Sequence, residues 1–405
     1  MKKVLLDKIG SVTLTCRLSR EVRLGTEIPA VEGGVVAVRV LNSKSTYNQL
    51  ELPSGRFSKV KPGDVVAGEL LRLLALHPRF LVVGVASTSH AGESLLSAFP
   101  HLAGTAVAGL RFETAAQVQA RLLDGGPLGL FAALPHGQSA SLVDECMARA
   151  QKAGTKLRVV DLSADFRFSD PAAYAAVYGK AHGAPARCPS FACALPEHLP
   201  GLPGTAVAHP GCFTTAVLLP LFPLFAADLI EEEVFVCAVT GSSGSGRTPS
   251  PRTHHPERNG NLYAYAPLAH RHEPEMRMLL EKARPGCTPS IEFVPHSGPF
   301  VRGIHATLRT TLRAPATAEA VASAVGALYA GSPFVEVALE PPRLTDVVGT
   351  NRCRIGVAVR GRTVLLTSVL DNLIKGAAGG GVQWMNRLFG LEEDTGLRLP
   401  GMGYF

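Results

Sequence analysis

Residues 128–162, with the sequence LGLFAALPHGQSASLVDECMARAQKAGTKLRVVDL, decide the fold class of this chain. Two short apolar runs, 128–134 and 157–162, lie on either side of a stretch, 139–153, that is rich in helix-forming residues. Short apolar runs bounded by turn residues are typical of buried strands. Strands that alternate with helices are typical of a parallel sheet with helices on both faces. The stretch therefore predicts a strand–helix–strand unit of an α/β domain.

The same alternation extends toward the N-terminus, while the C-terminal half has a different pattern. Residues 69–77 favour a helix that ends at Pro78, and the apolar run 80–86 predicts another buried strand. After residue 212 several segments are β-rich and partly alternating, which predicts an α+β domain with a mixed or antiparallel sheet. Its strands are expected at 233–239, 290–294, 304–312, 354–359 and 363–369, with one helix at 317–330. A final helix at 374–389 is expected to return to the first domain.

Length and composition narrow the class of protein further. The chain has 405 residues, 46% of them hydrophobic and 18% charged, and is long enough for two domains with large cores. Its net charge of +7 is scattered and forms no basic tail for nucleic acid or membrane, so it fits a small anionic substrate or cofactor. The longest apolar stretch, 216–227, is too short to span a bilayer, and the first residues make a poor signal peptide. These features predict a cytoplasmic protein.

The eight cysteines form no framework that would indicate a metal site or a disulfide scaffold. No two are spaced C-x-x-C, so we expect neither a zinc ribbon nor a dithiol redox site, and we predict no metal. One cysteine lies in a distinctive segment, His209-Pro-Gly-Cys-Phe-Thr-Thr-Ala216. Gly211 permits a sharp turn, and the helix expected after it would favour the thiolate of Cys212 over the thiol. Cys212 is therefore either a nucleophile or a buried structural cysteine.

Three polar segments of the C-terminal half are candidates for binding an anion or carrying a proton. The run 239–247, VTGSSGSGR, can offer backbone N–H groups and a guanidinium to an anion, or it is a plain surface loop. The two histidines of 270–275, HRHEPE, are suited to proton transfer, with a solvated helix start as the alternative. The turn-rich segment 294–303 gathers His296 and Arg302, as a carboxylate or phosphate site requires.

Taken together and in this order, several segments resemble the N-acetyl-gamma-glutamyl-phosphate reductase family. The resemblance runs from about residue 69 to the C-terminus, and several long motifs in register are more specific than any one of them. The motifs are Leu134-Pro-His-Gly137, Asp161-Leu-Ser-Ala-Asp-Phe-Arg167, Pro210-Gly-Cys212, the loop ending in Arg247, His270-Arg-His272, Gly349-Thr-Asn351 and Asp371-Asn-Leu373.

This resemblance implies a Rossmann-type cofactor domain and an α+β catalytic domain like that of glyceraldehyde-phosphate dehydrogenase, assembled as dimers or tetramers. It implies that Cys212 attacks an acyl phosphate and expels phosphate, and that NADPH reduces the thioester to a semialdehyde in arginine biosynthesis. We expect acid–base help from His270, oriented by Glu275, with His272 as the second choice. The resemblance assigns substrate binding to Arg167, Arg247, His296 and Arg302, and cofactor binding to Gly63, Gly68, Ser87, Thr88, Ser89, Pro135, His136, Gly241, Asn372 and Lys375.

The region before the first expected helix departs from this family. The usual Gly-x-x-Gly-x-x-Gly turn here reads VKPGDVVAG at 60–68, which keeps only two glycines and carries Asp64 where a phosphate is expected. Either residues 1–67 are an appended β-rich extension, or the run 35–41 supplies the missing strand from a distance. We prefer the first interpretation because this turn is normally short. The chain then divides into the extension 1–67, a Rossmann-type NADP-binding domain 68–211 completed by 374–405, and a catalytic and oligomerisation domain 212–373.

Two other functions stay open at this point. A homologous reductase of lysine biosynthesis acts on an aminoadipyl phosphate attached to a carrier protein, and that substrate would favour a more open, basic entrance. Alternatively, the altered glycine turn marks a non-catalytic relative that has become a binding module. Aspartate-semialdehyde dehydrogenase shares the mechanism but fits the motifs less well. The intact Cys212 and His270 favour catalysis on a small-molecule acyl phosphate.

Overall fold

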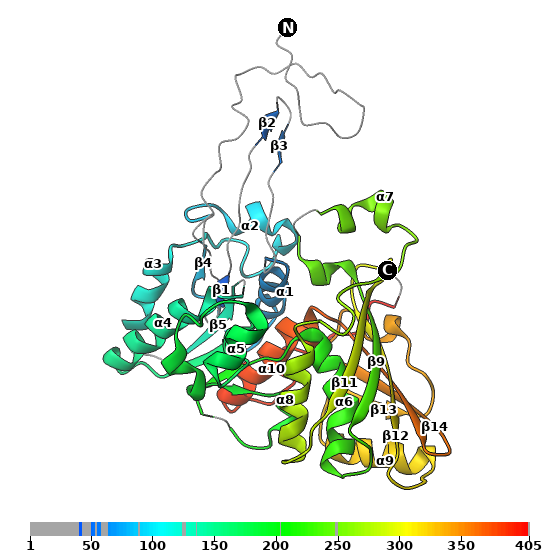
Figure 1. The fold of residues 1–405 in the computed structure, drawn as a ribbon. Helices are drawn as coiled ribbons and strands as arrows, with labels where there is room; N and C mark the ends of the chain where they lie inside the picture. Colours follow the sequence, from blue (N-terminus) through cyan, green and yellow to red (C-terminus); the bar gives the residue numbers. More distant parts are fainter. Residues whose placement is uncertain are drawn as a thin grey trace.

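The computed structural model describes residues 40–42, 50–52, 55–57, 64–87, 90–123, 127–134, 136–202, 204–247 and 250–403. They form two layered units, each built around one large sheet (Figure 1). The first unit contains a six-stranded parallel sheet, and the second contains a seven-stranded mixed sheet. This architecture confirms the predicted fold class, a Rossmann-type α/β domain joined to an α+β domain.

The first unit alternates strands and helices along the chain. Its strands are β1 (Val40–Asn42), β4 (Val85–Ala86), β5 (Leu128–Ala133), β6 (Leu157–Asp161), β7 (Ala192–Cys193) and β8 (Ala206–Ala208). Its helices are α1 (Asp64–Ala75), α2 (Leu95–Ala98), α3 (Ala115–Ala120), α4 (Ser139–Ala153), α5 (Pro171–Tyr178) and, from the end of the chain, α10 (Gly379–Leu388).

The six strands follow the order β4–β1–β5–β6–β8–β7, and every neighbouring pair is parallel. All side chains of β5 are buried, as its apolar sequence predicts. They alternate between the two faces because successive side chains of a strand point in opposite directions. Leu130 and Ala132 join the core on the α4 side, whereas Phe131 and Ala133 join the core formed with α1 and α10.

A strand from the N-terminal region lies inside this sheet, between β4 and β5. β1 pairs with both β4 and β5, with Val40 opposite Val85 on one side and Phe131 on the other. The pairing agrees with the interpretation in which the run 35–41 supplies the missing strand. The preferred interpretation, in which residues 1–67 are an appended β-rich extension, stays a prediction. A strand in this position satisfies backbone N–H and C=O groups of both neighbours, which would otherwise be left unpaired in the core.

The second unit follows Cys212 and contains the predicted β-rich segments. Its strands are β9 (Glu233–Thr240), β10 (Tyr263–Ala264), β11 (Ser290–Ser297), β12 (Ile304–Thr311), β13 (Val335–Ala338), β14 (Cys353–Arg360) and β15 (Thr363–Leu370). Its helices are α6 (Cys212–Ala226), α7 (His255–Arg258), α8 (Glu273–Ala283) and α9 (Ala318–Tyr329). Between the first strand and α1, β2 (Leu50–Leu52) and β3 (Gly55–Phe57) form a separate antiparallel pair.

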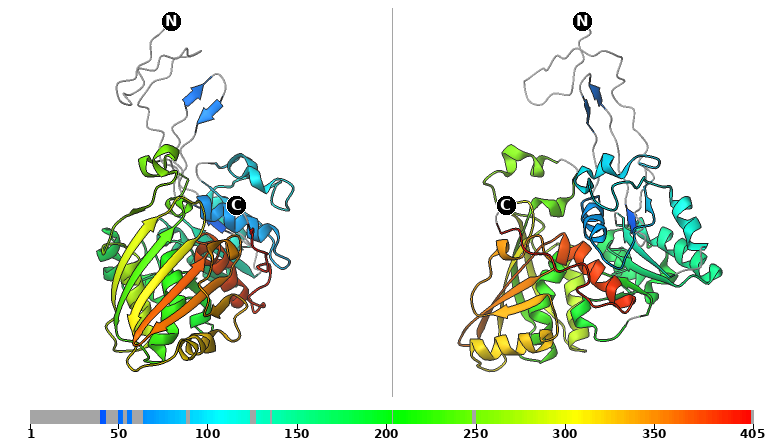
Figure 2. Two further views of the ribbon diagram at one scale, coloured as in Figure 1. Left: turned by 90° about the vertical axis from the view of Figure 1, so that its right-hand side faces the viewer. Right: turned by 180° about the vertical axis from the view of Figure 1, so that it is seen from behind.

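Helices cover one face of the seven-stranded sheet, whose order is β10–β11–β9–β12–β15–β14–β13. α6 packs against β12 and β15, α8 against β11, and α9 against β13 and β14. In the left view of Figure 2 the sheet turns its other face to the viewer. On that face Phe235 of β9, Arg309 of β12 and Leu365 of β15 lie side by side in register and are exposed.

The helical segment after β15 connects the two units. A π-helical turn, Ile374–Ala378, precedes α10, so the predicted helix 374–389 is present but is not regular along its whole length. The turn contacts α6 of the second unit and α1 of the first. α10 then packs beside α1 on the parallel sheet, where Trp384 and Met385 are completely buried.

None of the helices that the structure describes is long and apolar enough to cross a membrane. Within the same residues, no three His, Cys, Asp or Glu side chains come together in a way that could hold a metal ion.

Candidate active site

Cys212 is the first residue of α6, as the sequence pattern predicts. A three-residue turn, 209–211, joins this helix to β8. The carbonyl of Gly211 accepts hydrogen bonds from the backbone N–H and the hydroxyl of Thr215, at 2.8 and 3.0 Å. Nearly all other α6 side chains are buried. The backbone that carries the thiol is therefore held rigidly, while the Cys212 side chain itself is only partly covered.

The expected low pKa of Cys212 is wrong for this structure. Burial raises the pKa of the Cys212 thiol above its usual value. The positive charges of Arg167 and Arg271 and the backbone N–H of Phe213 act in the opposite direction without overcoming the effect of burial. The protein thus holds the thiol protonated near neutral pH, and a neighbouring base has to remove its proton during the reaction.

Glu275 fixes the turn before Cys212 and does not orient His270. Its carboxylate is completely buried in the first turn of α8. One oxygen accepts a hydrogen bond from Gly211 N at 2.6 Å, and the other accepts one from Arg167 Nη1 at 3.1 Å. Arg167 Nε also donates to the His209 carbonyl at 3.1 Å. Although burial opposes it, the Glu275 charge raises the pKa of Arg167 above its usual value. Arg167 and Glu275 therefore clamp the turn from both domains.

His272, rather than His270, is the imidazole beside the turn that precedes Cys212. A β-carbon at Gly211 would lie 2.6 Å from His272 Nε2, which shows that the ring rests directly against the residue before Cys212. The ring is buried, and its Nδ1 has no hydrogen-bond partner among the described residues. Burial, with added positive charge from His270 and two arginines, holds the pKa of His272 well below its usual value. His272 is therefore a neutral imidazole, able to accept a proton.

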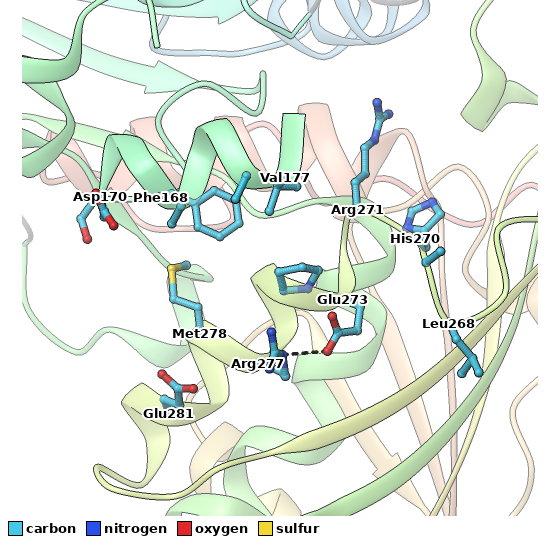
Figure 3. Close-up of a pocket in the computed structure, with 15 residues that line it drawn as sticks. Phe168, Asp170, Val177, Leu268, His270, Arg271, Glu273, Arg277, Met278 and Glu281 are labelled. Carbon is cyan, nitrogen blue, oxygen red and sulfur yellow. Dashed lines mark ion pairs between the residues drawn. The ribbon is translucent and has the colours of Figure 1, made fainter. Parts of the chain in front are cut away.

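His270 does not line the cavity that contains the thiol, although its ring centroid lies 4.7 Å from that of His272. Its Nδ1 accepts a hydrogen bond from the backbone N–H of His272 at 3.2 Å. Burial lowers the pKa of His270 to about 4. Its ring lines a different cavity of about 730 Å³, which we call the outer cavity, between α5 and α8 (Figure 3). The outer cavity is lined by residues that include Phe168, Asp170, Val177, Leu268, His270, Arg271, Glu273, Arg277, Met278 and Glu281.

The cavity that contains Cys212, which we call the Cys212 cavity, has a volume of about 490 Å³. That volume is typical of a small-molecule site. None of the described residues in its lining is Asp or Glu, although three basic side chains line it. Its polar lining consists of His136, Arg167, Tyr178, Lys180, His209, Cys212, Ser243, Arg271, His272 and Asn372.

Five of these polar residues were not among the predicted site residues, although His209, Ser243 and Arg271 lie within segments that the sequence analysis quoted. Tyr178 is the last residue of α5, and Lys180 follows it without any recognisable motif. Arg271 lies between His270 and His272, and this position is the only feature of the sequence that indicates its place in the cavity. The exposed Arg271 side chain lines both cavities.

Three of the four predicted substrate-binding residues do not reach the Cys212 cavity. Arg302 is paired with Asp371 through Nε at 3.0 Å and with Glu69 through Nη2 at 3.0 Å. Arg247 donates to the carbonyl of Ala98, at 3.0 Å, in the first domain. His296 lies in β11, where its Nδ1 is 3.6 Å from the sulfur of Cys237. Arg167 alone among the four lines the cavity.

The predicted cofactor residues divide into two groups in the structure. His136 and Asn372 line the Cys212 cavity, whereas Lys375 is completely buried between Glu197, at 2.5 Å, and Gln383, at 2.8 Å. Gly68 packs against Phe99, Gly241 packs against the carbonyl of Val301, and Ser87 is buried at the end of β4. Gly63, Thr88, Ser89 and Pro135 lie outside the described residues.

The crevice beside β1 and β5 fits the nicotinamide end of a dinucleotide. From β1 the chain runs to β4 on one side and later to β5 on the other, so the strand order reverses here. Ligands of parallel sheets bind at the carboxyl ends of the strands at such a point. The Cys212 cavity opens there, between the end of β5 and Val65 and Val66 in the first turn of α1. His136, Ser243 and Asn372 would hold the nicotinamide end.

Gly376 lies directly against Cys212. A β-carbon at this position would lie 2.7 Å from Cys212 Cβ. We expect Gly376→Ala to lower kcat by at least about 10-fold, because small displacements of a catalytic group are costly. A matched control is Gly326→Ala in α9, where a β-carbon meets no atom within 4 Å. Steady-state kinetics and thermal unfolding of both variants test this, and an unchanged kcat for Gly376→Ala would contradict it.

Comparison with known proteins agrees with this architecture. The family model of the semialdehyde dehydrogenase NAD binding domain matches residues 63–191, and that of the semialdehyde dehydrogenase dimerisation domain matches residues 212–372. The structure is similar to that of aspartate semialdehyde dehydrogenase II complexed with ASA from Vibrio cholerae, with a TM-score of 0.56. The match covers 80% of this chain and 95% of that one at 16% identity, and it shows the fold alone.

Curated relatives are similar over most of the sequence. The chain is 38% identical to N-acetyl-gamma-glutamyl-phosphate reductase of Dehalococcoides mccartyi, over 82% of this chain and 93% of that protein. It is 40% identical to the proteins of the same name from Desulforudis audaxviator and Pseudomonas savastanoi, over 82% of this chain and 95% of each. The resemblance seen in the motifs is thereby confirmed. The chain belongs to the N-acetyl-gamma-glutamyl-phosphate reductase family, and it is an oxidoreductase with a nicotinamide-cofactor domain.

Proposed function

We propose that this chain reduces N-acetyl-gamma-glutamyl phosphate to N-acetylglutamate semialdehyde and phosphate, with NADPH, through a thioester on Cys212. One observation carries the proposal: Cys212 and the neutral His272 share a cavity that has three basic side chains and no described acidic one. Such a cavity attracts a substrate with several negative charges. The curated relatives that bear this enzyme name give independent support.

The first half of the reaction needs a base for the thiol. Because burial raises the pKa of Cys212 and lowers that of His272, the proton stays on sulfur until the substrate arrives. Cys212 then attacks the acyl carbon as His272 accepts the thiol proton, the bond from that carbon to the phosphate oxygen breaks, and the departing phosphate takes up a proton from water. The Arg167–Glu275 clamp keeps the turn at 209–211 in place while the sulfur changes its bonding.

The second half of the reaction reduces the thioester. When bound, NADPH supplies the hydride. His272, still protonated, would donate a hydrogen bond to the oxygen on which negative charge develops. As the carbon–sulfur bond breaks and the aldehyde leaves, His272 returns its proton to the Cys212 sulfur. The thiol and the neutral imidazole are thereby restored.

Replacing the two histidines separates their roles. We expect His272→Asn to lower kcat by about 10²- to 10⁴-fold, as the loss of a general acid–base group does, and His270→Asn to lower it by less than about 10-fold. The reason is that His272 rests against Gly211, whereas His270 lines the outer cavity. Steady-state kinetics of both variants, with circular dichroism as a check of folding, measure this. A larger loss of kcat for His270→Asn than for His272→Asn would assign the acid–base role to His270.

The reverse reaction tests the proposed function directly. N-acetylglutamate semialdehyde, phosphate and NADP⁺ are mixed with the protein, and NADPH absorbance is followed, with Cys212→Ser as the control. We expect a signal that depends on both phosphate and Cys212. The absence of a phosphate-dependent signal from the folded protein would overturn the proposal. Repeating the assay with NAD⁺ tests the choice of NADP⁺.

We further propose that the protein is a cytoplasmic homo-oligomer, a dimer or a tetramer, which associates through the open face of the seven-stranded sheet. The match to the dimerisation-domain model over residues 212–372 supports self-association. The exposed Phe235 and Leu365, on either side of Arg309, offer apolar surface on that face. Light scattering after size-exclusion chromatography determines the number of subunits, and a monomer would contradict the proposal.

A further inference from the structure

One basic side chain of the Cys212 cavity forms no ion pair or hydrogen bond with any other residue that the structure describes. Arg167 is paired with Glu275. Lys180 donates from Nζ to the carbonyl of His136 at 2.6 Å. The Arg271 side chain forms no ion pair or hydrogen bond with any residue that the structure describes, and it is exposed. Figure 3 shows it directed away from the ion pair between Glu273 and Arg277. Its guanidinium therefore remains available to a ligand.

One residue that lines the same cavity, Tyr178, has a buried hydroxyl without a partner. The Tyr178 oxygen is inaccessible to solvent and has no hydrogen-bond partner among the described residues. An unpaired buried hydroxyl costs free energy unless a ligand satisfies it. Burial raises the pKa of Tyr178 to about 12, and the charges of Arg167 and Arg271 act against that rise. Tyr178 therefore keeps its proton at neutral pH, and its O–H is a donor without a partner among the described residues.

We propose that Arg271 and the Tyr178 hydroxyl bind the phosphate group that leaves during attack by Cys212, and the inorganic phosphate that enters in the reverse direction. This inference rests on the proposed function. A planar guanidinium donates two parallel hydrogen bonds to a phosphate, and a phenol adds another. Arg167 is less suited because it would have to give up Glu275, whereas an exposed side chain such as Arg271 can follow phosphate toward solvent.

Phosphate kinetics in the reverse reaction test this assignment. For Arg271→Met we expect the KM for phosphate to rise by about 10- to 100-fold, as the loss of hydrogen bonds from a charged group implies. The KM for the semialdehyde should stay within about 2-fold, and Arg271→Lys should fall between the wild type and Arg271→Met because a lysine keeps the charge without the planar fork. Tyr178→Phe should raise the phosphate KM by about 3- to 10-fold.

Arg277→Met is the matched control for Arg271→Met. Arg277 is also exposed and lines the outer cavity, but it does not line the Cys212 cavity. It should leave the phosphate KM unchanged. An unchanged phosphate KM in Arg271→Met overturns the inference. A rise confined to the KM for the semialdehyde also overturns it, because Arg271 would then bind the substrate carboxylate.

A second measurement needs neither turnover nor cofactor. Inorganic phosphate should slow the alkylation of Cys212 by iodoacetamide in the wild type, and this protection should be lost in Arg271→Met but kept in Arg277→Met. If the wild type fails to turn over the semialdehyde yet phosphate protects Cys212 through Arg271, the proposed function fails while the anion site stands. If turnover is normal and phosphate protects Cys212 equally in Arg271→Met and in the wild type, only the anion site is overturned.

Discussion

Cys212→Ser loses at least about 10⁴-fold in kcat, the order of loss seen when a catalytic nucleophile is removed. A serine hydroxyl is far less acidic than a thiol, and the buried, weakly basic His272 cannot remove its proton efficiently. The fold should survive, because the side chain is only partly covered and differs by a single atom. NADPH formation in the reverse reaction measures the activity, and circular dichroism measures the folding. Substantial activity in the serine variant would exclude the thioester mechanism.

Glu275→Ala destabilises the protein by about 3–5 kcal/mol, the range for breaking a buried ion pair by removing one partner. The substitution leaves the buried Arg167 charge without its carboxylate and removes the acceptor of the Gly211 N–H. Activity should fall as well, since the turn before Cys212 loses its clamp. Urea unfolding followed by circular dichroism measures the stability.

Two variants serve as controls for Glu275→Ala. Glu273→Ala, in the same turn of α8, removes a partly exposed carboxylate paired with Arg277 at 2.8 Å, and should cost no more than about 1 kcal/mol. Glu275→Gln keeps an acceptor for Gly211 and should be less damaging than Glu275→Ala. Equal losses of stability for the alanine variants at 273 and 275 would show that the clamp contributes little.

The architecture could be predicted largely because the signals are local. The runs 128–134 and 157–162 and the helix 139–153 carry their own periodicity, and each appears in the structure almost residue for residue. β1 was harder to place because its two partners, β4 and β5, lie far away in the sequence. A short strand in a parallel sheet has no hairpin to fix its position.

The site was predicted less completely because its details depend on burial and on distant partners. Motif spacing places His270 and His272 together, but only the packing of α8 shows which ring meets Gly211. Likewise, Lys375 reads as a free cation until Glu197, 178 positions away, is found beside it. The helix N-terminus at Cys212 was predictable, whereas the desolvation that raises the thiol pKa was not.

The contacts made by residues 371–388 bear on the order in which the protein becomes active during translation. Gly376 lies on Cys212, Gly380 lies on the ring of His209, and α10 closes the parallel sheet beside α1. Domains generally fold as they emerge from the ribosome, N-terminal first. Here neither the cofactor domain nor the Cys212 cavity is complete until residues 371–388, which follow both sheets in the sequence, have been synthesised. A nascent or prematurely terminated chain therefore carries Cys212 without the surroundings that control it.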